Sequence, residues 1–384
     1  MSRIGLLPRI LIAIVLGILL GNFIPLGIAR FFATVSHLFS QFISFCVPIL
    51  IFGLVVPAIT RMGHGAGRFL LLTIVLAYGD TVLSALLGYG IGSWLFPDIV
   101  AATGPYEAQA SAAIEPYFKL LIPPFADVLS VLLFSFILGM AVSRLKLERL
   151  TALFEEFQLV ISFAIKHIIV PLLPFYILSI FTTMTFSGEV YRVIGIFLMI
   201  IVVIFVIHIF ILLYEFCVAG LVTRSNPLRL LRTMLPAYFM ALGTSSSAAT
   251  IPVTLDCTLR NGVRPEVAGF TVPLCATIHM SGSAMKITCF ALAVCLMQGL
   301  PHDSLLFLSF ILMLGIMMVA SPGVPGGSIM AALAPLSSIL GFGAEAQALM
   351  ITLYIAIDSF GTACNVTGDG AIALIIDKVR GQRL

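Results

Sequence analysis

The chain has 384 residues, of which 60% are hydrophobic and 10% are charged, and its formal net charge is +3. This composition excludes a water-soluble domain, while so small a net charge points to no particular partner. Apolar runs of spanning length recur from Ile10 onward, which predicts an all-α membrane protein with several spans. The seven cysteines have no metal-ligand spacing and are interpreted as small core residues. No segment resembles a P-loop, which argues against an ATP-driven pump.

The first part of the chain predicts six membrane spans, at residues 6–29, 39–59, 69–96, 118–142, 157–184 and 193–222. The third span is expected to end at Pro97, and Pro123-Pro124 is expected to bend or divide the fourth. If the spans alternate in direction, most arginines and lysines at their ends lie on the side of the amino terminus. The positive-inside rule makes this side the cytoplasm.

Two later segments predict re-entrant hairpins. Residues of about 235–255 are too short and too broken to span, with Gly243-Thr-Ser-Ser-Ser-Ala-Ala-Thr250 in their middle, and basic residues flank them on both sides. Such a polar tip exists at membrane depth only where it is buried in protein or lines a cavity. Residues of about 305–340 carry a similar tip, Ser321-Pro-Gly-Val-Pro-Gly-Gly-Ser328.

Two further spans follow the hairpins, one after each. The span at about 265–299 is interrupted at His279-Met-Ser-Gly-Ser283, and Lys286 follows closely. The span at about 346–378 carries polar side chains within roughly 40° of one helix face, namely Asp358, Thr362, Asn365 and Asp369. A carboxylate at membrane depth costs at least ~2.5 kcal/mol, so this polar stripe is interpreted as a binding site rather than a helix contact.

The two hairpin-and-helix units enter the membrane from opposite sides, which predicts inverted repeats around a solute site at the bilayer midplane. Free N–H groups at hairpin tips suit a carboxylate, and free carbonyl groups suit a cation. The pattern therefore predicts a transporter core.

These motifs resemble the dicarboxylate/amino acid:cation symporter family, which has the glutamate-transporter fold. The matching motifs are Ser245-Ser-Ser-Ala-Ala-Thr-Ile-Pro252, a degenerate Asn-Met-Asp-Gly-Thr break, Gly-Val-Pro-Gly in the second hairpin, and Asn365-Val-Thr-Gly-Asp369. The resemblance covers nearly the whole chain. It implies eight transmembrane helices plus two re-entrant hairpins, in a homotrimer that works as an elevator. Residues 1–222 would mainly form the scaffold, with the third and sixth spans partly joining the transport core of residues 223–384.

The resemblance also implies roles for individual residues. Asp358 would hold a substrate ammonium, and Asp369 with Asn365 would hold a sodium ion, the only cofactor expected. The substrate-binding candidates are Ser246, Ser247, Val324, Gly326, Asp358, Gly361, Thr362 and Asn365. The candidates for cation binding or coupling are Asp80, His279, Ser281, Ser283, Lys286, Asn365 and Asp369.

Departures from the family pattern bear on the substrate and the cation. Members with acidic substrates have an arginine at the position of Gly361, so a small neutral amino acid is favoured unless His279 or Lys286 serves a distal carboxylate. His279 and Ser281 replace an asparagine and an aspartate of a sodium site, and a histidine makes a proton the alternative cation. Asp80 and Lys286 are predicted to pair as a built-in substitute for one ion.

The predicted function is cation-coupled transport of a small amino acid in the inner (plasma) membrane, with both termini cytoplasmic. The expected partners are substrate, a monovalent cation, lipid and two further copies of the chain, without nucleic acid. The alternatives are an acidic amino acid or dicarboxylate symporter, an obligate exchanger and, less favoured, an ion channel. An enzyme is not expected, because no nucleophile motif surrounds His279, Asp358 and Ser246. Glu215 is expected to snorkel or to pair locally.

Overall fold

The computed structural model describes residues 6–63, 67–102, 114–126, 128–188, 190–321 and 326–381, and the regular structure within these ranges is helical. The first part of the chain forms α1 (Leu6–Phe23), α2 (Leu26–Gly63), α3 (Gly67–Ala102), α4 (Val128–Arg144), α5 (Glu148–Ala164), the π-helical turn η1 (Ile165–Ile169), α6 (Val170–Phe186) and α7 (Val190–Thr223). The order of these helices follows the order of the predicted spans.

Several helix ends differ from the prediction, mostly at prolines. The first helix ends at Phe23, and the carbonyl of Pro25 accepts the Ala29 N–H (3.1 Å) to open α2 well before residue 39. The expected end of the third helix at Pro97 is wrong, because α3 continues to Ala102 and a single proline removes only one helical hydrogen bond. The fourth helix begins after Pro123-Pro124, because a proline disfavours the helical conformation of the residue before it.

The second part of the chain forms helices in pairs: α8 (Pro227–Thr244) with α9 (Ser247–Arg260), α10 (Pro265–Ile278) with α11 (Ser281–Gln298), α12 (Ser304–Ala320) with α13 (Gly327–Ser338), and α14 (Ala344–Ala356) with α15 (Asp358–Gly381). The breaks predicted in the first three pairs are confirmed. The break at Ile357 is not predicted, and it divides the last span one residue before Asp358.

The first of these pairs is longer than the predicted 235–255. Asn226 begins α8 as its N-cap, because its side chain accepts the N–H groups of Leu228 (2.9 Å) and Arg229 (3.2 Å). Ser245 takes a left-handed conformation (φ 48°) that ends α8 and lets α9 fold back against it.

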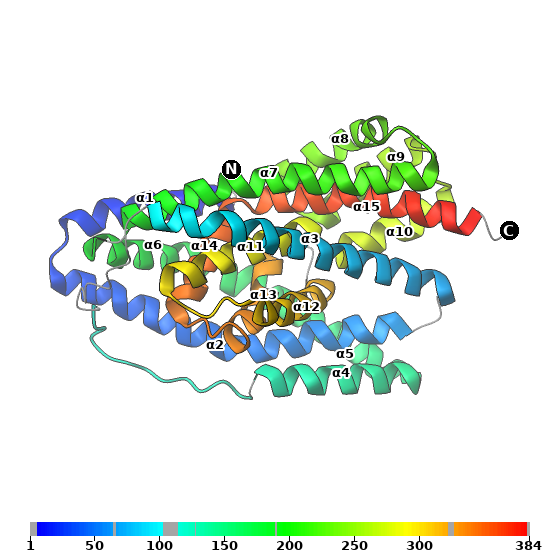
Figure 1. The fold of residues 1–384 in the computed structure, drawn as a ribbon. Coiled ribbons are helices and arrows are strands. Elements are labelled where there is room, and N and C mark those ends of the chain that lie inside the picture. The colour runs from blue at the N-terminus through cyan, green and yellow to red at the C-terminus, as the bar shows by residue number, and fades with distance from the viewer. Residues whose placement is uncertain are drawn as a thin grey trace, which may run out of the picture.

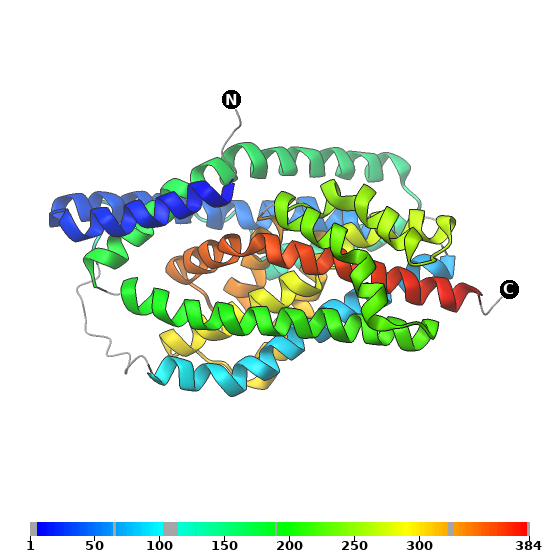
Figure 2. The same cartoon turned by 90° about the horizontal axis from the view of Figure 1, so that it is seen from above.

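α15 lies at the centre of the molecule. It packs against α7, α8, α9, α10 and α11, while α11 packs against α3 (Figure 1 and Figure 2). By contrast, α1 packs on α6 and α2 packs on α4, away from α15. Among the described residues, five helical segments have the length and apolar composition needed to cross a membrane. Within their most apolar stretches, 94% of the residues are buried for Pro265–Gln298 and 39% for Val193–Thr223. The helix bearing His279 and Lys286 is therefore a core element, whereas α7 keeps an apolar outer face.

Candidate substrate and cation site

Broken helix ends meet beside α15. The Met280 N–H, in the break between α10 and α11, donates to Thr81 Oγ1 of α3 (3.1 Å). The Gly326 N–H, at the start of α13, donates to Asp358 Oδ2 at the start of α15 (2.8 Å). Helix starts present N–H groups without intrahelical partners, so such a junction can bind anionic groups.

Asp358 forms an ion pair with Lys286 of α11. The Lys286 Nζ lies 3.6 Å from Asp358 Oδ1 and donates to the carbonyl of Ile357 (3.2 Å), which the break between α14 and α15 leaves free. The same ammonium lies 3.7 Å from the centre of the Tyr354 ring, in cation–π contact. Both side chains of the ion pair are buried, so each charge depends on the other and on these neighbours.

Gly361 makes room for the lysine. A Cβ at this position would lie 2.6 Å from Lys286 Nζ and 2.9 Å from its Cε. Gly361 therefore admits a cationic side chain from another helix at the position where the resemblance places an arginine in members with acidic substrates.

Asn365 fixes the start of α11. Its Oδ1 accepts the N–H groups of Gly282 (2.9 Å) and Ser283 (3.2 Å), and its Nδ2 donates to Ser283 Oγ (3.0 Å). Ser283 Oγ also accepts from the Tyr354 hydroxyl (3.0 Å). Asn365 and Ser283 thus hold α11 against α15 and connect this contact to the ring beneath Lys286.

Seven residues before Lys286, His279 bridges two carboxylates. Its Nδ1 lies 2.9 Å from Asp369 Oδ1 of α15, and its Nε2 lies 2.8 Å from Asp80 Oδ2 of α3. A neutral imidazole has one N–H, so only one of these contacts can be a hydrogen bond from the neutral ring to an ionised carboxylate. The arrangement therefore requires one further proton, on the imidazole or on a carboxyl group.

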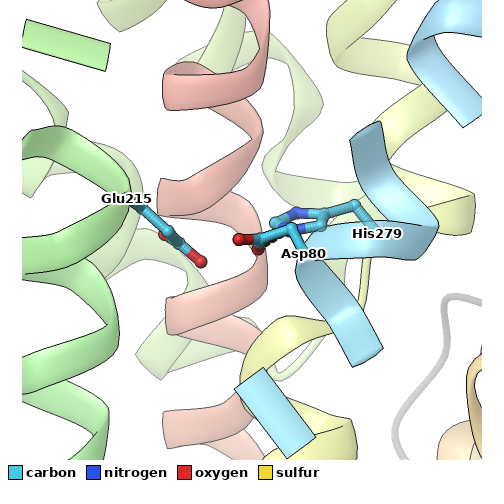
Figure 3. Close-up of side chains that lie close together, drawn as sticks. All are labelled: Asp80, Glu215 and His279. Carbon is cyan, nitrogen blue, oxygen red and sulfur yellow. Dashed lines mark hydrogen bonds and ion pairs between the residues drawn. The ribbon is translucent and has the colours of Figure 1, made fainter. Parts of the chain in front are cut away.

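Glu215 of α7 completes this cluster of acidic residues around His279. Ligand atoms of Asp80, Glu215 and His279 all lie within 4.8 Å of one another, and Figure 3 shows the Asp80 carboxylate between the other two groups. Of the two expectations for Glu215, snorkelling is wrong, because the residue is buried with 4% exposure, whereas its place beside Asp80 and His279 agrees with a local pairing. Neither of its carboxylate oxygens has a hydrogen-bond partner among the described residues. The Tyr214 hydroxyl donates to Asp80 Oδ1.

Gly368 leaves space for the Glu215 and His279 side chains, just as Gly361 leaves space for Lys286. A Cβ at Gly368 would lie 2.6 Å from Glu215 Oε2 and 2.7 Å from His279 Cε1. The glycine in the Asn-Val-Thr-Gly-Asp motif was thus a sequence signal for close packing at this point. The motif did not reveal which side chains occupy the space.

The predicted pairing of Asp80 with Lys286 is wrong. Asp80 contacts His279, whereas Lys286 pairs with Asp358. The two basic side chains lie seven residues apart on the broken span, so they face α15 at different points along its length. Asp80 does reach the helix break, through its contact with His279. A Cβ at Gly88 would lie 2.9 Å from the Met285 side chain, which explains the close approach of α3 to α11.

The remaining predicted residues lie nearby or outside the described chain. Ser246 Oγ caps α9 by accepting the Ala249 N–H (3.3 Å), and α9 packs against α15. Thr362 is buried and donates to the Asp358 carbonyl (3.2 Å), within its own helix. Ser247 is buried, as is Ser281. Val324 lies outside the described residues.

Apolar helices of spanning length around buried, charged side chains are the features of a multi-pass membrane transporter. The profile of the Sodium:dicarboxylate symporter family matches residues 6–379. The chain is also similar to the "Serine/threonine transporter SstT" of Acinetobacter baumannii strains AYE and ATCC 17978. Each alignment is 28% identical over a length of 404 residues, gaps included, and covers 98% of this chain and 97% of the relative.

The chain therefore belongs to the Sodium:dicarboxylate symporter family. The family and these relatives are transporters and not enzymes, which agrees with the sequence prediction.

The contacts of this chain do not fit the sodium ion that the family name implies at Asn365 and Asp369. Asn365 Oδ1 already accepts two N–H groups, and Asp369 Oδ1 faces the His279 ring. Around this ring, the described oxygens without a hydrogen-bond partner are Asp369 Oδ2, Ser281 Oγ and the two carboxylate oxygens of Glu215. Hard cations in proteins bind sets of about six oxygen ligands, so these four side-chain oxygens do not form a complete set.

Proposed function

We propose that this protein is a secondary active transporter that moves a small α-amino acid across the membrane together with a cation. The observation that carries the proposal is the junction of Asp358 with the start of α13, where a buried carboxylate meets the Gly326 N–H. A carboxylate suits the ammonium of an amino acid, and N–H groups at helix starts suit its carboxylate. The similarity to serine/threonine transporters supports the same substrate class.

The side chain of the substrate is small and uncharged in this proposal. Ser246, Ser247 and the tip of the second hairpin receive the α-carboxylate, and Thr362 lies beside the ammonium. Gly361 provides no arginine for a second carboxylate. An acidic amino acid is the second candidate, because the Lys286 ammonium lies 3.6 Å from Asp358 and can serve a distal carboxylate.

The contacts of His279 support the proton as the coupled cation. An imidazolium donates to Asp80 and Asp369 at once, and so takes the place of a bound metal ion between two carboxylates. The imidazole ring can bind or release a proton at either nitrogen, which suits a group that carries a proton during transport.

The proposed architecture has eight transmembrane helices and two re-entrant hairpins, α8–α9 and α12–α13, related by inverted repeats. The transport core of residues 223–384 moves as an elevator against the scaffold of residues 1–222 in a homotrimer. The packing of α3 on α11 and of α7 on α15 supports the assignment of these two helices partly to the moving core. The positions of arginine and lysine support cytoplasmic termini.

The test is a thermal-shift panel of amino acids and dicarboxylates, each measured with sodium, with potassium and at acid pH. A ligand that binds only the folded protein stabilises it by about 2.7 kcal/mol at about 100 times its Kd. L-Serine, L-threonine or L-alanine should stabilise the protein, more strongly at acid pH than with sodium. Tight binding of succinate or malate, which lack an ammonium, would contradict the proposed substrate. Counterflow without an ion gradient separates an exchanger from a symporter.

A further inference from the structure

The carboxylate proposed to bind the substrate already has an ammonium partner inside the protein. Asp358 Oδ1 faces Lys286 Nζ at 3.6 Å, and Asp358 Oδ2 accepts the Gly326 N–H at 2.8 Å. Both side chains are buried, with 0% exposure for Lys286 and 7% for Asp358. A free ammonium group and the lysine therefore compete for the same carboxylate.

The surroundings of Lys286 are built for an ammonium. The carbonyl of Ile357 accepts a hydrogen bond from it at 3.2 Å, and the Tyr354 ring lies 3.7 Å beneath it. Gly361 leaves the space into which Nζ reaches, since a Cβ there would approach it to 2.6 Å. A lysine ammonium and an amino acid ammonium carry the same charge and donate hydrogen bonds in the same way.

We propose that Lys286 is a tethered substitute for the ammonium of the substrate, and so determines which ligands the site accepts. In the empty protein Lys286 neutralises Asp358, and an incoming substrate ammonium displaces it. This inference rests on the proposed function, because it takes Asp358 as the substrate-binding carboxylate.

The displacement selects ligands that carry both charges. The zwitterion of an amino acid supplies an ammonium for Asp358, and its carboxylate at the hairpin tips adds a negative charge that balances the released lysine, so the occupied site stays neutral. A ligand with only an ammonium would leave Lys286 without a counter-charge. A ligand with only a carboxylate would find Lys286 held by Asp358. The built-in pair also keeps the empty site neutral, which allows the empty core to cross the membrane and return.

Lys286→Met tests the competition through a gain of binding. In the variant Asp358 is always available, so the Kd for L-serine should fall at least about tenfold, as expected when the competent fraction of the site rises from a tenth or less to one. Ethanolamine, which carries an ammonium and a hydroxyl but no carboxylate, should bind the variant and not the original protein. A lysine with only a structural role, or one that binds substrate directly, would give weaker binding of L-serine and no binding of ethanolamine.

Transport in liposomes tests the second consequence. In the variant, net uptake into liposomes without internal L-serine should fall at least about tenfold more than the exchange of labelled for unlabelled L-serine, because an unpaired Asp358 in the empty core opposes its return. Equal loss of exchange and net uptake would overturn the inference. Arg264→Met is the matched control, since the Arg264–Asp377 ion pair (2.7 Å) likewise connects α15 to the broken seventh span, at the N-cap of α10, but lies at the far end of α15.

Gly361→Ala provides a second variant if Lys286→Met does not fold. Its added methyl group displaces the lysine but keeps the charge, so the same gain in L-serine affinity and the same loss of net uptake are expected, with smaller size. An unchanged Kd and an unchanged ratio of net uptake to exchange in this variant would overturn the inference.

A measurement without ligand separates this inference from the proposed function. Lys286→Met and Asp358→Asn should each lower the melting temperature more than the double variant does, because each single change leaves one unpaired buried charge. Additive effects would overturn the inference even if the protein transports L-serine. Coupled effects together with no binding of any amino acid would overturn the proposed function, and with it the displacement, while leaving the ion pair established.

Discussion

Two charged clusters cross the interface between the broken seventh span and the last helix, and they differ in their balance of charge. At the level of Gly361, one base and one acid face each other, Lys286 and Asp358. At the level of Gly368, the single base His279 faces Asp369 and Asp80, with Glu215 beside them. A balanced pair has no place for a further charge unless a ligand brings both signs. A cluster with more acids than bases attracts a cation or a proton.

The difference suggests a division of work between the two levels of α15. In the proposed mechanism, the Gly361 level recognises a zwitterion and the Gly368 level holds the coupling proton. Asn365 lies between them and fixes the start of α11 through Gly282 and Ser283, so a change at one level has a direct route to the other. Variants that alter the charge balance at one level can therefore test the role of each.

The largest effect is expected at the balanced level, from Asp358→Asn. The variant removes the carboxylate partner of a substrate ammonium and leaves Lys286 unpaired, which destabilises the fold by about 3–5 kcal/mol. L-Serine binding should fall at least about 100-fold, or about 3 kcal/mol. Equilibrium binding and thermal melting measure both effects.

The control for this variant is the double variant Asp358→Asn with Lys286→Met. It should recover much of the stability but none of the L-serine binding. Undiminished L-serine binding in either variant would remove Asp358 from the substrate site.

The second prediction converts the acid-rich level into a metal site. His279→Asn with Ser281→Asp restores the family's Asn-Met-Asp pattern, removes the bridging ring and adds a carboxylate. Sodium should then stabilise the double variant by about 2.7 kcal/mol at about 100 times its Kd, whereas the original protein should respond little.

Thermal shifts in sodium chloride and choline chloride at equal ionic strength measure this effect. The single variant Ser281→Asp, which keeps the imidazole, is the control. An equal sodium response in the original protein would show that His279 does not replace the ion.

The third prediction concerns the spare carboxylate of the acid-rich level. Glu215 adds a buried carboxyl group that can share the proton of the cluster, so Glu215→Gln should weaken proton binding. The pH of half-maximal L-serine uptake should therefore fall, by about one pH unit or 1.36 kcal/mol. Glu215→Asp keeps the carboxyl group and should move the midpoint less. A midpoint that stays fixed or rises in Glu215→Gln would separate Glu215 from proton coupling.

Local sequence signals predict the two levels only in part. The glycine, proline and serine breaks mark the ends of α8, α10 and α12, and helical spacing places Asp358, Thr362, Asn365 and Asp369 on one buried face of α15. These features depend on neighbouring residues along the chain, so one sequence suffices to predict them.

The pairing of charges depends on how helices pack against one another, which helical spacing does not determine. Lys286 is predicted to pair with Asp80 but pairs with Asp358, because its partner depends on the level at which α11 crosses α15. Glu215 lies in the most apolar helix of the first part of the chain, and nothing in its local sequence distinguishes a buried site residue from a snorkelling one.

The smallest effect is expected from the ring beneath Lys286. Tyr354→Phe keeps the cation–π contact at 3.7 Å and removes only the hydroxyl that donates to Ser283 Oγ, which should cost about 1 kcal/mol of stability. Tyr354→Leu also removes the ring and should cost about a further 1–2 kcal/mol, because the contact is shielded from water. In the Lys286→Met background the difference between Phe and Leu should fall to the packing contribution alone, since no cation remains above the ring. Thermal melting of the four variants measures this cycle. The same difference in both backgrounds would mean that the ring supports the fold but does not hold the ammonium at the Gly361 level.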